Sequence, residues 1–279
     1  MLLNRIALSR LIRVLKRSGF TVFRSIGKGH FRLKSSEIIK LFTLPKKAVA
    51  SVRLGEHALK MCNPYWFIQN FNEIFEDEVY LFRCEKASPF ILDCGSNVGL
   101  SILFFKHLFP DAQVIGFEPD PFLFKILEQN IAEFELSNVR LENNAVWKDA
   151  CQSIRFLPDI GLGGRLDEAP DSENAISVNT VRLKDYLTKK IDFLKIDIEG
   201  AEIEVVKDIQ ERLNWVERLF VEYHSEQSKP QELQTLLDIL QQSGFRYHVK
   251  EANPVLHPFI KSERNSGYDL QLNIYAFRD

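Results

Sequence analysis

The sequence predicts an α/β protein built on a parallel, doubly wound sheet. From residue 89 onward, short apolar runs of strand length alternate with helical patterns, as in parallel sheets covered by helices. Polar side chains repeatedly follow the apolar runs, where parallel strands end, and sheets of this kind bind ligands outside those ends. The residues expected at this edge are Asp93 to Gly99, Glu118, Asn144 to Val146, and Asp197 to Glu199.

A glycine turn follows the first of these strands. The apolar run at residues 89–92 ends in Asp93, and a helical pattern begins at residue 101 after the pattern D-x-G-x-x-x-G. The turn matches neither the dinucleotide motif nor a phosphate-binding P-loop. An acid at the strand end suits a cationic amine, and S-adenosylmethionine carries an amine and a sulfonium. The predicted contacts to this cofactor are Asp93, Gly95, Ser96, Asn97 and Gly99, with backbone N–H groups close to the ligand.

The remaining elements are expected in the same alternating order. Strands are predicted at residues 113–117, 139–141, 191–196, 219–221, 245–249 and 270–277, and helices at 122–134, 183–187, 201–213 and 232–242. Residues 154–156 and 176–178 indicate an inserted hairpin, whose glycine-rich loop at 158–165 is a candidate lid. Before the sheet, residues 31–33, 38–42 and 49–54 are expected to form short strands.

The first 50 residues are strongly basic, with twelve Lys or Arg and one acid. Met1 to Arg17 has the pattern of a basic amphipathic helix. Its apolar residues do not form a continuous run long enough to span a bilayer. It is either an interfacial membrane helix or a helix packed on its own domain or on a second subunit. We place a boundary between an N-terminal α/β extension at residues 1–88 and the main domain at 89–279.

Charge and cysteine content exclude several classes of protein. Residues 51–279 carry 24 Lys or Arg against 37 acids and show no base-flipping motif, so a nucleic-acid partner is not expected. The four cysteines form no C-x-x-C pair or zinc-ligand spacing. This usage fits a reducing compartment, so a cytoplasmic protein is expected.

Two further groups are candidates for contacts with the nucleoside. Glu118, followed by Pro119, ends the next strand, where an acid can accept both ribose hydroxyls; alternatively it is an N-cap partner of the following helix. Asn144 and Ala145 lie where an amide side chain and a backbone N–H can read an adenine edge. Tyr80, a further candidate for contact with the cofactor, ends an aromatic stretch that either belongs to the core or folds over the pocket mouth.

Residues 195–202 and 222–224 carry the second concentration of charge. Lys195, Asp197 and Glu199 alternate and would share one strand face. Glu222 and His224 stand two apart at the end of the next strand. A histidine there is a candidate proton acceptor, although a lone histidine is more often structural. Glu202 is expected only to favour a helix N-terminus.

Four strings together resemble the FkbM family of S-adenosylmethionine-dependent methyltransferases. They are ILDCGSNVG (residues 91–99), FEPDP (117–121), KIDIEGAE (195–202) and EYH (222–224), in the family's order. The resemblance covers residues 65–277 and implies a class I methyltransferase fold, a Rossmann-like sheet of seven strands with the last antiparallel. It also implies O-methylation of a hydroxyl on a sugar or secondary metabolite. Where many members have a Ser-rich hairpin loop, this chain has glycines at 161, 163 and 164.

We therefore expect an O-methyltransferase with a small-molecule, sugar or glycan acceptor. The candidate catalytic residues are Lys195, Asp197, Glu199, Glu222 and His224. His224 is the expected base, because an unperturbed imidazole titrates near pH ~6.5, and Asp197 is expected beside the sulfonium. No metal is assigned, although the carboxylates offer an alternative site for Mg²⁺.

The competing hypothesis is a methyltransferase-like binding protein without turnover, docked to a membrane or a glycan-assembly complex through its basic arm. The intact set of Asp93, Glu118 and Asp197 argues against it.

Overall fold

The computed structural model describes residues 27, 31–150, 153–158, 164–166, 174–254, 257, 259–260 and 267–278. Met1 to Arg17 and residues 159–163 of the expected lid lie outside the described residues. Within the described part, no helix combines the length and the apolar character needed to cross a membrane.

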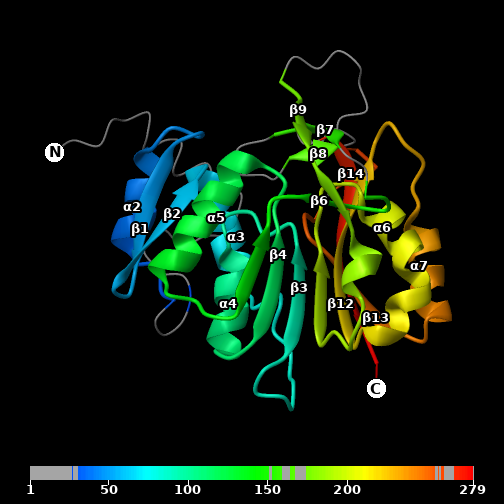
Figure 1. Cartoon of the computed structure of the whole chain (residues 1–279). Helices are drawn as coiled ribbons and strands as arrows, with labels where there is room; N and C mark the ends of the chain where they lie inside the picture. Colours follow the sequence, from blue (N-terminus) through cyan, green and yellow to red (C-terminus); the bar gives the residue numbers. More distant parts are fainter. Residues whose placement is uncertain are drawn as a thin grey trace.

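A seven-stranded sheet forms the centre of the fold (Figure 1). Its strand order is β13-β14-β12-β11-β3-β4-β5, and β14 is antiparallel to both of its neighbours. This confirms the expected α/β sheet of seven strands with the last one antiparallel, the class I methyltransferase arrangement. Its strands are β3 (Phe90–Cys94), β4 (Gln113–Phe117), β5 (Val139–Glu142), β11 (Phe193–Ile196), β12 (Arg218–Glu226), β13 (Arg246–Glu251) and β14 (Tyr268–Phe277).

Helices cover both faces of the sheet, as Figure 1 shows. One face packs on α3 (Pro64–Phe75), α4 (Leu100–Leu108) and α5 (Pro121–Glu133). The other packs on α6 (Glu202–Ile209), α7 (Leu233–Gln242) and the short 3₁₀ helices η1 (Leu183–Tyr186) and η2 (Gln210–Trp215). Because strand side chains alternate, Ile91 and Asp93 point to the α3–α4 face, whereas Leu92 and Cys94 point to the α6–α7 face.

The N-terminal part corrects two expectations. Residues 31–33 do not form a strand, because only Leu33 among them makes a bridge. Residues 38–42 lie in a helix, α2 (Ser35–Thr43), and not in a strand. Ile38 and Leu41 are both buried, and their spacing of three residues places them on one helix face. The expected strand at residues 49–54 is β1 (Val49–Leu54), which pairs with β2 (His57–Cys62).

The extension and the sheet share one hydrophobic core. Leu33, Leu59 and Phe71 pack in the same buried cluster as Leu103 and Val114. Apolar side chains from both sides of the expected boundary at residues 88 and 89 therefore pack together. The domain boundary at this point stays a prediction from the sequence.

A second group of strands lies beyond the carboxyl end of β5, at the top of Figure 1. The expected hairpin is confirmed: β7 (Ile154–Leu157) pairs with β9 (Ile176–Val178) and also with β8 (Arg165–Leu166). A parallel pair, β6 (Ala145–Trp147) and β10 (Thr180–Arg182), joins this group to the sheet. These strands border the edge at which the motif residues gather.

Candidate active site

The glycine turn between β3 and α4 is tightly packed against the end of β11. Gly95 has a φ of 86°, and a Cβ atom added to it would lie 1.9 Å from the backbone oxygen of Asp197. Only glycine fits this combination of left-handed backbone and close approach. Asp93 and Asp197 are therefore held at neighbouring strand ends, as expected from the parallel pairing of β3 and β11.

The N–H groups of the turn are already used within the protein. Those of Gly95 and Ser96 donate to the Phe117 oxygen at 3.0 and 2.9 Å, and that of Asn97 donates to Glu118 Oε2 at 2.9 Å. In this structure these three N–H groups are therefore not free to donate to a ligand. The turn is not a cradle of free N–H groups for an anion, which distinguishes it from a phosphate-binding loop.

Asp93 is completely buried and supports the turn from below. Its Oδ2 accepts hydrogen bonds from Ser96 Oγ at 2.9 Å and Ser101 Oγ at 2.6 Å. Its Oδ1 has no hydrogen-bond partner among the described residues and lies 3.4 Å from Lys195 Nζ. The ion pair with Lys195 gives this enclosed carboxylate a partner of opposite charge.

Lys195 connects the two strand ends and contacts protein groups. Its Nζ lies 3.3 Å from Asp197 Oδ2 and donates to the Gly95 oxygen at 3.0 Å. Burial by itself lowers the Lys195 pKa, but Asp197 and Asp93 raise it by more, so the side chain stays an ammonium. Lys195 therefore pairs with two carboxylates, those of Asp93 and Asp197.

Glu118 follows β4 beside the glycine turn. It is buried, and its two oxygens accept from the Asn97 and Asp120 N–H groups, both at 2.9 Å. Burial raises the Glu118 pKa to about 8, although these hydrogen bonds act in the opposite direction. Asp120, and not Glu118, caps α5, since its side chain accepts from the N–H groups of Phe122 and Leu123.

The expected adenine contacts need a correction. The Ala145 N–H donates to the Asn179 oxygen at 2.9 Å and is not free for a base edge. Asn144 is half-buried beside it. Asn143, which the sequence analysis passed over, donates to the Glu118 oxygen at 2.8 Å and to the Pro119 oxygen at 3.2 Å. Asn143 therefore fixes the backbone on which Glu118 and Pro119 stand.

Carboxylates surround His224 at the carboxyl end of β11 and β12. Its Nε2 lies 3.6 Å from both Glu199 Oε2 and Glu222 Oε1, and its Nδ1 lies 3.0 Å from Glu202 Oε1. Burial lowers the His224 pKa, but the three carboxylates outweigh it and raise the pKa well above the usual value. The surroundings of His224 therefore differ from those of the unperturbed imidazole on which its expected role as the base depends, because they favour the protonated ring.

Two of these carboxyl groups have strongly altered proton affinity. Burial raises the Glu199 pKa to about 7, with Asp197 and Glu202 adding to the shift and His224 opposing it. Burial, followed by the charge of Asp197, raises the Glu222 pKa well above its usual range. The side chains of Glu199 and Glu222 remain about 20% exposed, so a bound molecule can reach them.

Glu202 is the residue that sequence reasoning undervalued most. It is buried at the start of α6 and accepts the N–H groups of Ile198 and Gly200. These bonds close a turn in which Glu199 has a left-handed φ of 57°. Glu199 therefore does not continue the strand face of Lys195 but is redirected by a turn that Glu202 holds.

Tyr80, Glu73 and Asn273 complete the wall on the α3 side. The buried Tyr80 ring packs edge-on against Phe220, and its centroid lies 5.8 Å from Lys195 Nζ. Asn273 donates to Glu73 Oε1 at 2.9 Å. Neither Glu73 nor Asn273 stands in a recognisable motif, and only the fold brings them to the site.

One set of side chains here has metal-ligand spacing. Ligand atoms of Asp197, Glu199 and His224 lie within 4.8 Å of one another. In this arrangement both ring nitrogens of His224 already face carboxylates, with Nε2 3.6 Å from Glu199 Oε2 and Nδ1 3.0 Å from Glu202 Oε1. The contacts of His224 with the carboxylates are sufficient to explain why these side chains lie close together. We assign no metal to the cluster.

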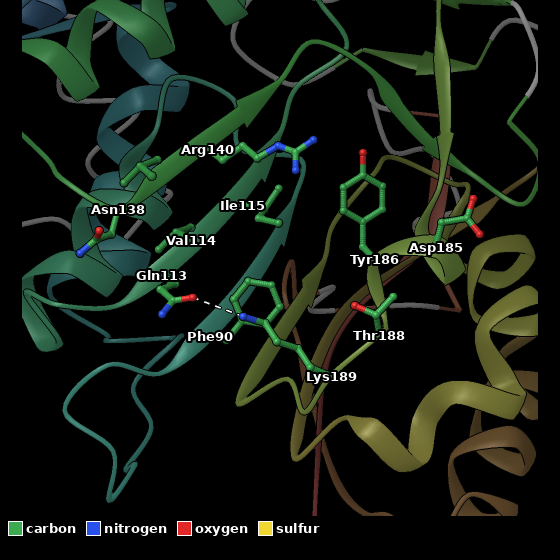
Figure 2. A pocket seen from close by; sticks show the side chains of 11 residues that line it. Phe90, Gln113, Val114, Ile115, Asn138, Arg140, Asp185, Tyr186, Thr188 and Lys189 are labelled. Carbon is green, nitrogen blue, oxygen red and sulfur yellow. Dashed lines mark hydrogen bonds between the residues drawn. The ribbon is translucent and has the colours of Figure 1, made fainter.

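A cavity of about 650 Å³ lies elsewhere on the protein (Figure 2). It is lined by the first residues of β3, β4 and β5 and by η1, at the opposite end of the strands from the glycine turn. Lys189 donates to Gln113 there at 3.3 Å and lies over the Phe90 ring. None of the motif residues lines this cavity. We therefore do not assign the active site to it, although it is large.

The fold and the edge at which the motifs meet together define a class I methyltransferase. The family model described as "Methyltransferase FkbM domain" matches residues 93–247, more than half of the chain. The chain belongs to the FkbM methyltransferase family.

Several curated relatives are also methyltransferases. "Methyltransferase sdnD" of Sordaria araneosa is 29% identical over 50% of this chain and 68% of its own. "31-O-demethyl-FK506 methyltransferase FkbM" of Streptomyces tacrolimicus is 27% identical over 63% and 78%. "2-O-methyltransferase NoeI" of Sinorhizobium fredii is 30% identical over 56% and 72%. The crystal structure of methyltransferase FkbM from Methylobacillus flagellatus aligns at 16% identity with a TM-score of 0.49, over 71% of this chain and 45% of that one.

Proposed function

We propose that this protein is an S-adenosylmethionine-dependent O-methyltransferase acting on a hydroxyl of a sugar, glycan or secondary metabolite. The observation that carries the proposal is the meeting of the glycine turn, Glu118 and Asp197 at one edge of the sheet, in a chain of the FkbM family. Two relatives, named a 2-O-methyltransferase and a 31-O-demethyl-FK506 methyltransferase, support O-methylation.

The donor set at this edge fits the proposed cofactor. Each Glu118 oxygen accepts one backbone N–H and keeps a second lone pair for a ribose hydroxyl. Asp197 is 23% exposed beside Gly95 and suits a cationic group. Because Asp93 is enclosed by Ser96, Ser101 and Lys195, we assign the contact with the cationic part to Asp197 and a supporting role to Asp93. When bound, the cofactor would supply the electrophilic methyl group.

On the acceptor side we assign proton removal to Glu199. A general base works best when its pKa lies near the working pH, and the Glu199 pKa of about 7 meets this condition. His224 holds Glu199 and Glu222 in place through its positive charge, and Glu202 orients the ring through Nδ1. The acceptor hydroxyl would lie against Glu199 while its oxygen faces the methyl group, and this positioning supplies much of the acceleration.

Transfer of labelled methyl groups from S-adenosylmethionine tests the function. We expect label in one or more members of a panel of glycosides, glycans and hydroxylated polyketides. Glu199→Gln should lower turnover by roughly 10²-fold or more and leave S-adenosylhomocysteine binding intact. Tight binding of S-adenosylhomocysteine without transfer to any acceptor would favour the non-catalytic alternative. Absence of both would contradict the proposal.

A further inference from the structure

Glu73 and Asn273 meet beside the catalytic cluster although 200 positions separate them in the sequence. Glu73 comes from α3 in the N-terminal extension and Asn273 from β14, so both lie outside the matched family domain. Asn273 stands opposite Glu222 in the β12–β14 ladder, and opposite residues of an antiparallel pair project to the same sheet face. Through its hydrogen bond with Asn273, Glu73 therefore lies at the sheet face that carries Glu222.

The amide of Asn273 is only half satisfied. The residue is 2% exposed, and its Nδ2 donates to Glu73 Oε1. Its Oδ1 is buried and has no hydrogen-bond partner among the residues that the structure describes. A buried acceptor without a donor is costly, so such an oxygen marks a place where a bound molecule or water contributes a donor.

The charges around this amide select the kind of group that can bind. Burial raises the pKa of Glu73 and of Glu222; the charge of Asp197 adds to both shifts, and Glu73 adds to that of Glu222. The nearby cations are already engaged: Lys195 pairs with Asp93 and Asp197, and His224 with Glu199, Glu202 and Glu222. Across the ladder from Asn273, Lys250 is exposed and only offsets part of the shift at Glu73. A wall of carboxyl groups with a free amide oxygen offers several acceptors to a hydrogen-bond donor, whereas a carboxylate bound there would add a further acidic group to those already present.

We propose that Glu73 and Asn273 form an acceptor subsite that binds a second hydrogen-bond donor, a hydroxyl or amine, next to the hydroxyl that is methylated. The subsite admits neutral or amino-substituted polyhydroxylated acceptors and excludes carboxylated ones. This inference rests on the proposed methyltransferase function, because it places the acceptor against Glu199 and Glu222.

Three matched probes test the subsite on the full chain saturated with S-adenosylhomocysteine. Methyl glucoside, methyl 6-amino-6-deoxyglucoside and methyl glucuronide share one ring and carry at C6 a hydroxyl, an amine and a carboxylate, respectively. Saturation-transfer NMR titrations should detect the first two and not the glucuronide. Glu73→Gln and Asn273→Ala should each weaken binding roughly tenfold. The exposed Glu56→Gln, on the β1–β2 turn, is the control and should leave binding unchanged.

Each outcome of this experiment is decisive. Glucuronide binding equal to glucoside binding, equal affinities in the wild type and in both variants, or no probe binding to the loaded wild type would overturn the subsite. Thermal stabilisation by S-adenosylhomocysteine is measured for every variant and shows that it is folded and loaded. Loss of that stabilisation in the wild type would instead count against the proposed function.

Discussion

Glu202 Oε1 lies 3.0 Å from His224 Nδ1, and both side chains are 1% exposed. The same Glu202 carboxylate closes the turn that carries Glu199. One buried acid therefore orients the imidazolium and sets the direction of the carboxyl group that we assign as the base. The acceptor side of the site depends on this pair.

We predict strong energetic coupling between Glu202 and His224. His224→Asn leaves three carboxylates without their cation and should lower the unfolding free energy by about 3 kcal/mol. A double-mutant cycle with Glu202→Gln, measured by urea denaturation, should give a coupling of about 1–3 kcal/mol. The surface pair Lys184–Glu211 is the control and should show no measurable coupling. Additive effects of Glu202→Gln and His224→Asn would contradict this account of the cluster.

We predict that the protein without cofactor loses stability as the pH rises from about 5 to 9. The pKa values of Glu118, Glu199, Glu222 and Glu73 are all raised in the folded state. The folded state therefore binds more protons than the unfolded state in this range, so stability present at low pH is lost as the pH passes the folded values. The raised pKa of His224 acts with the same sign.

Melting temperatures measured across this range check the prediction. The slope should be negative, and Glu222→Gln should flatten it because an amide cannot ionise. Glu211→Gln, at an exposed surface pair, should keep the wild-type slope. A melting temperature that rises steadily between pH 5 and 9 would show that the buried acids are not perturbed as described.

We predict that S-adenosylhomocysteine binds more tightly as the pH rises toward 8. Glu118, with a pKa of about 8, is protonated at lower pH, and only its ionised form can accept from both ribose hydroxyls. Binding then releases a proton, which calorimetry in buffers of different ionisation enthalpy detects. Glu118→Gln should bind weakly and without this proton release. A pH-independent affinity for the wild type would remove Glu118 from the nucleoside contact.

The sequence was sufficient to predict the architecture and the edge that holds the site. Alternating apolar runs specify a parallel sheet, and residues after them meet at one edge because all these strands run the same way. Asp93, Glu118, Asp197 and Glu222 are at that edge for this reason. The helix at residues 35–43 was not predicted because so short an apolar pattern fits the period of a helix as well as that of a strand.

The roles of individual side chains could not be predicted in the same way. An imidazole two residues after an acid looks like a base in sequence, but its pKa depends on Glu199 and Glu202 folding back around it. Asn273 lacks a motif and reaches the site only through the antiparallel last strand. Interactions of this kind follow from tertiary packing, which local patterns do not encode.

Calorimetric titration of S-adenosylhomocysteine into the wild type, Glu118→Ala and Arg140→Gln distinguishes the two possible cofactor sites. Glu118 stands at the proposed cofactor edge, whereas Arg140 lines the separate cavity of Figure 2. The account predicts binding to the wild type and to Arg140→Gln with equal affinity, and loss of most of it in Glu118→Ala. Binding that survives in Glu118→Ala but is lost in Arg140→Gln would place the cofactor in the other cavity and contradict the account.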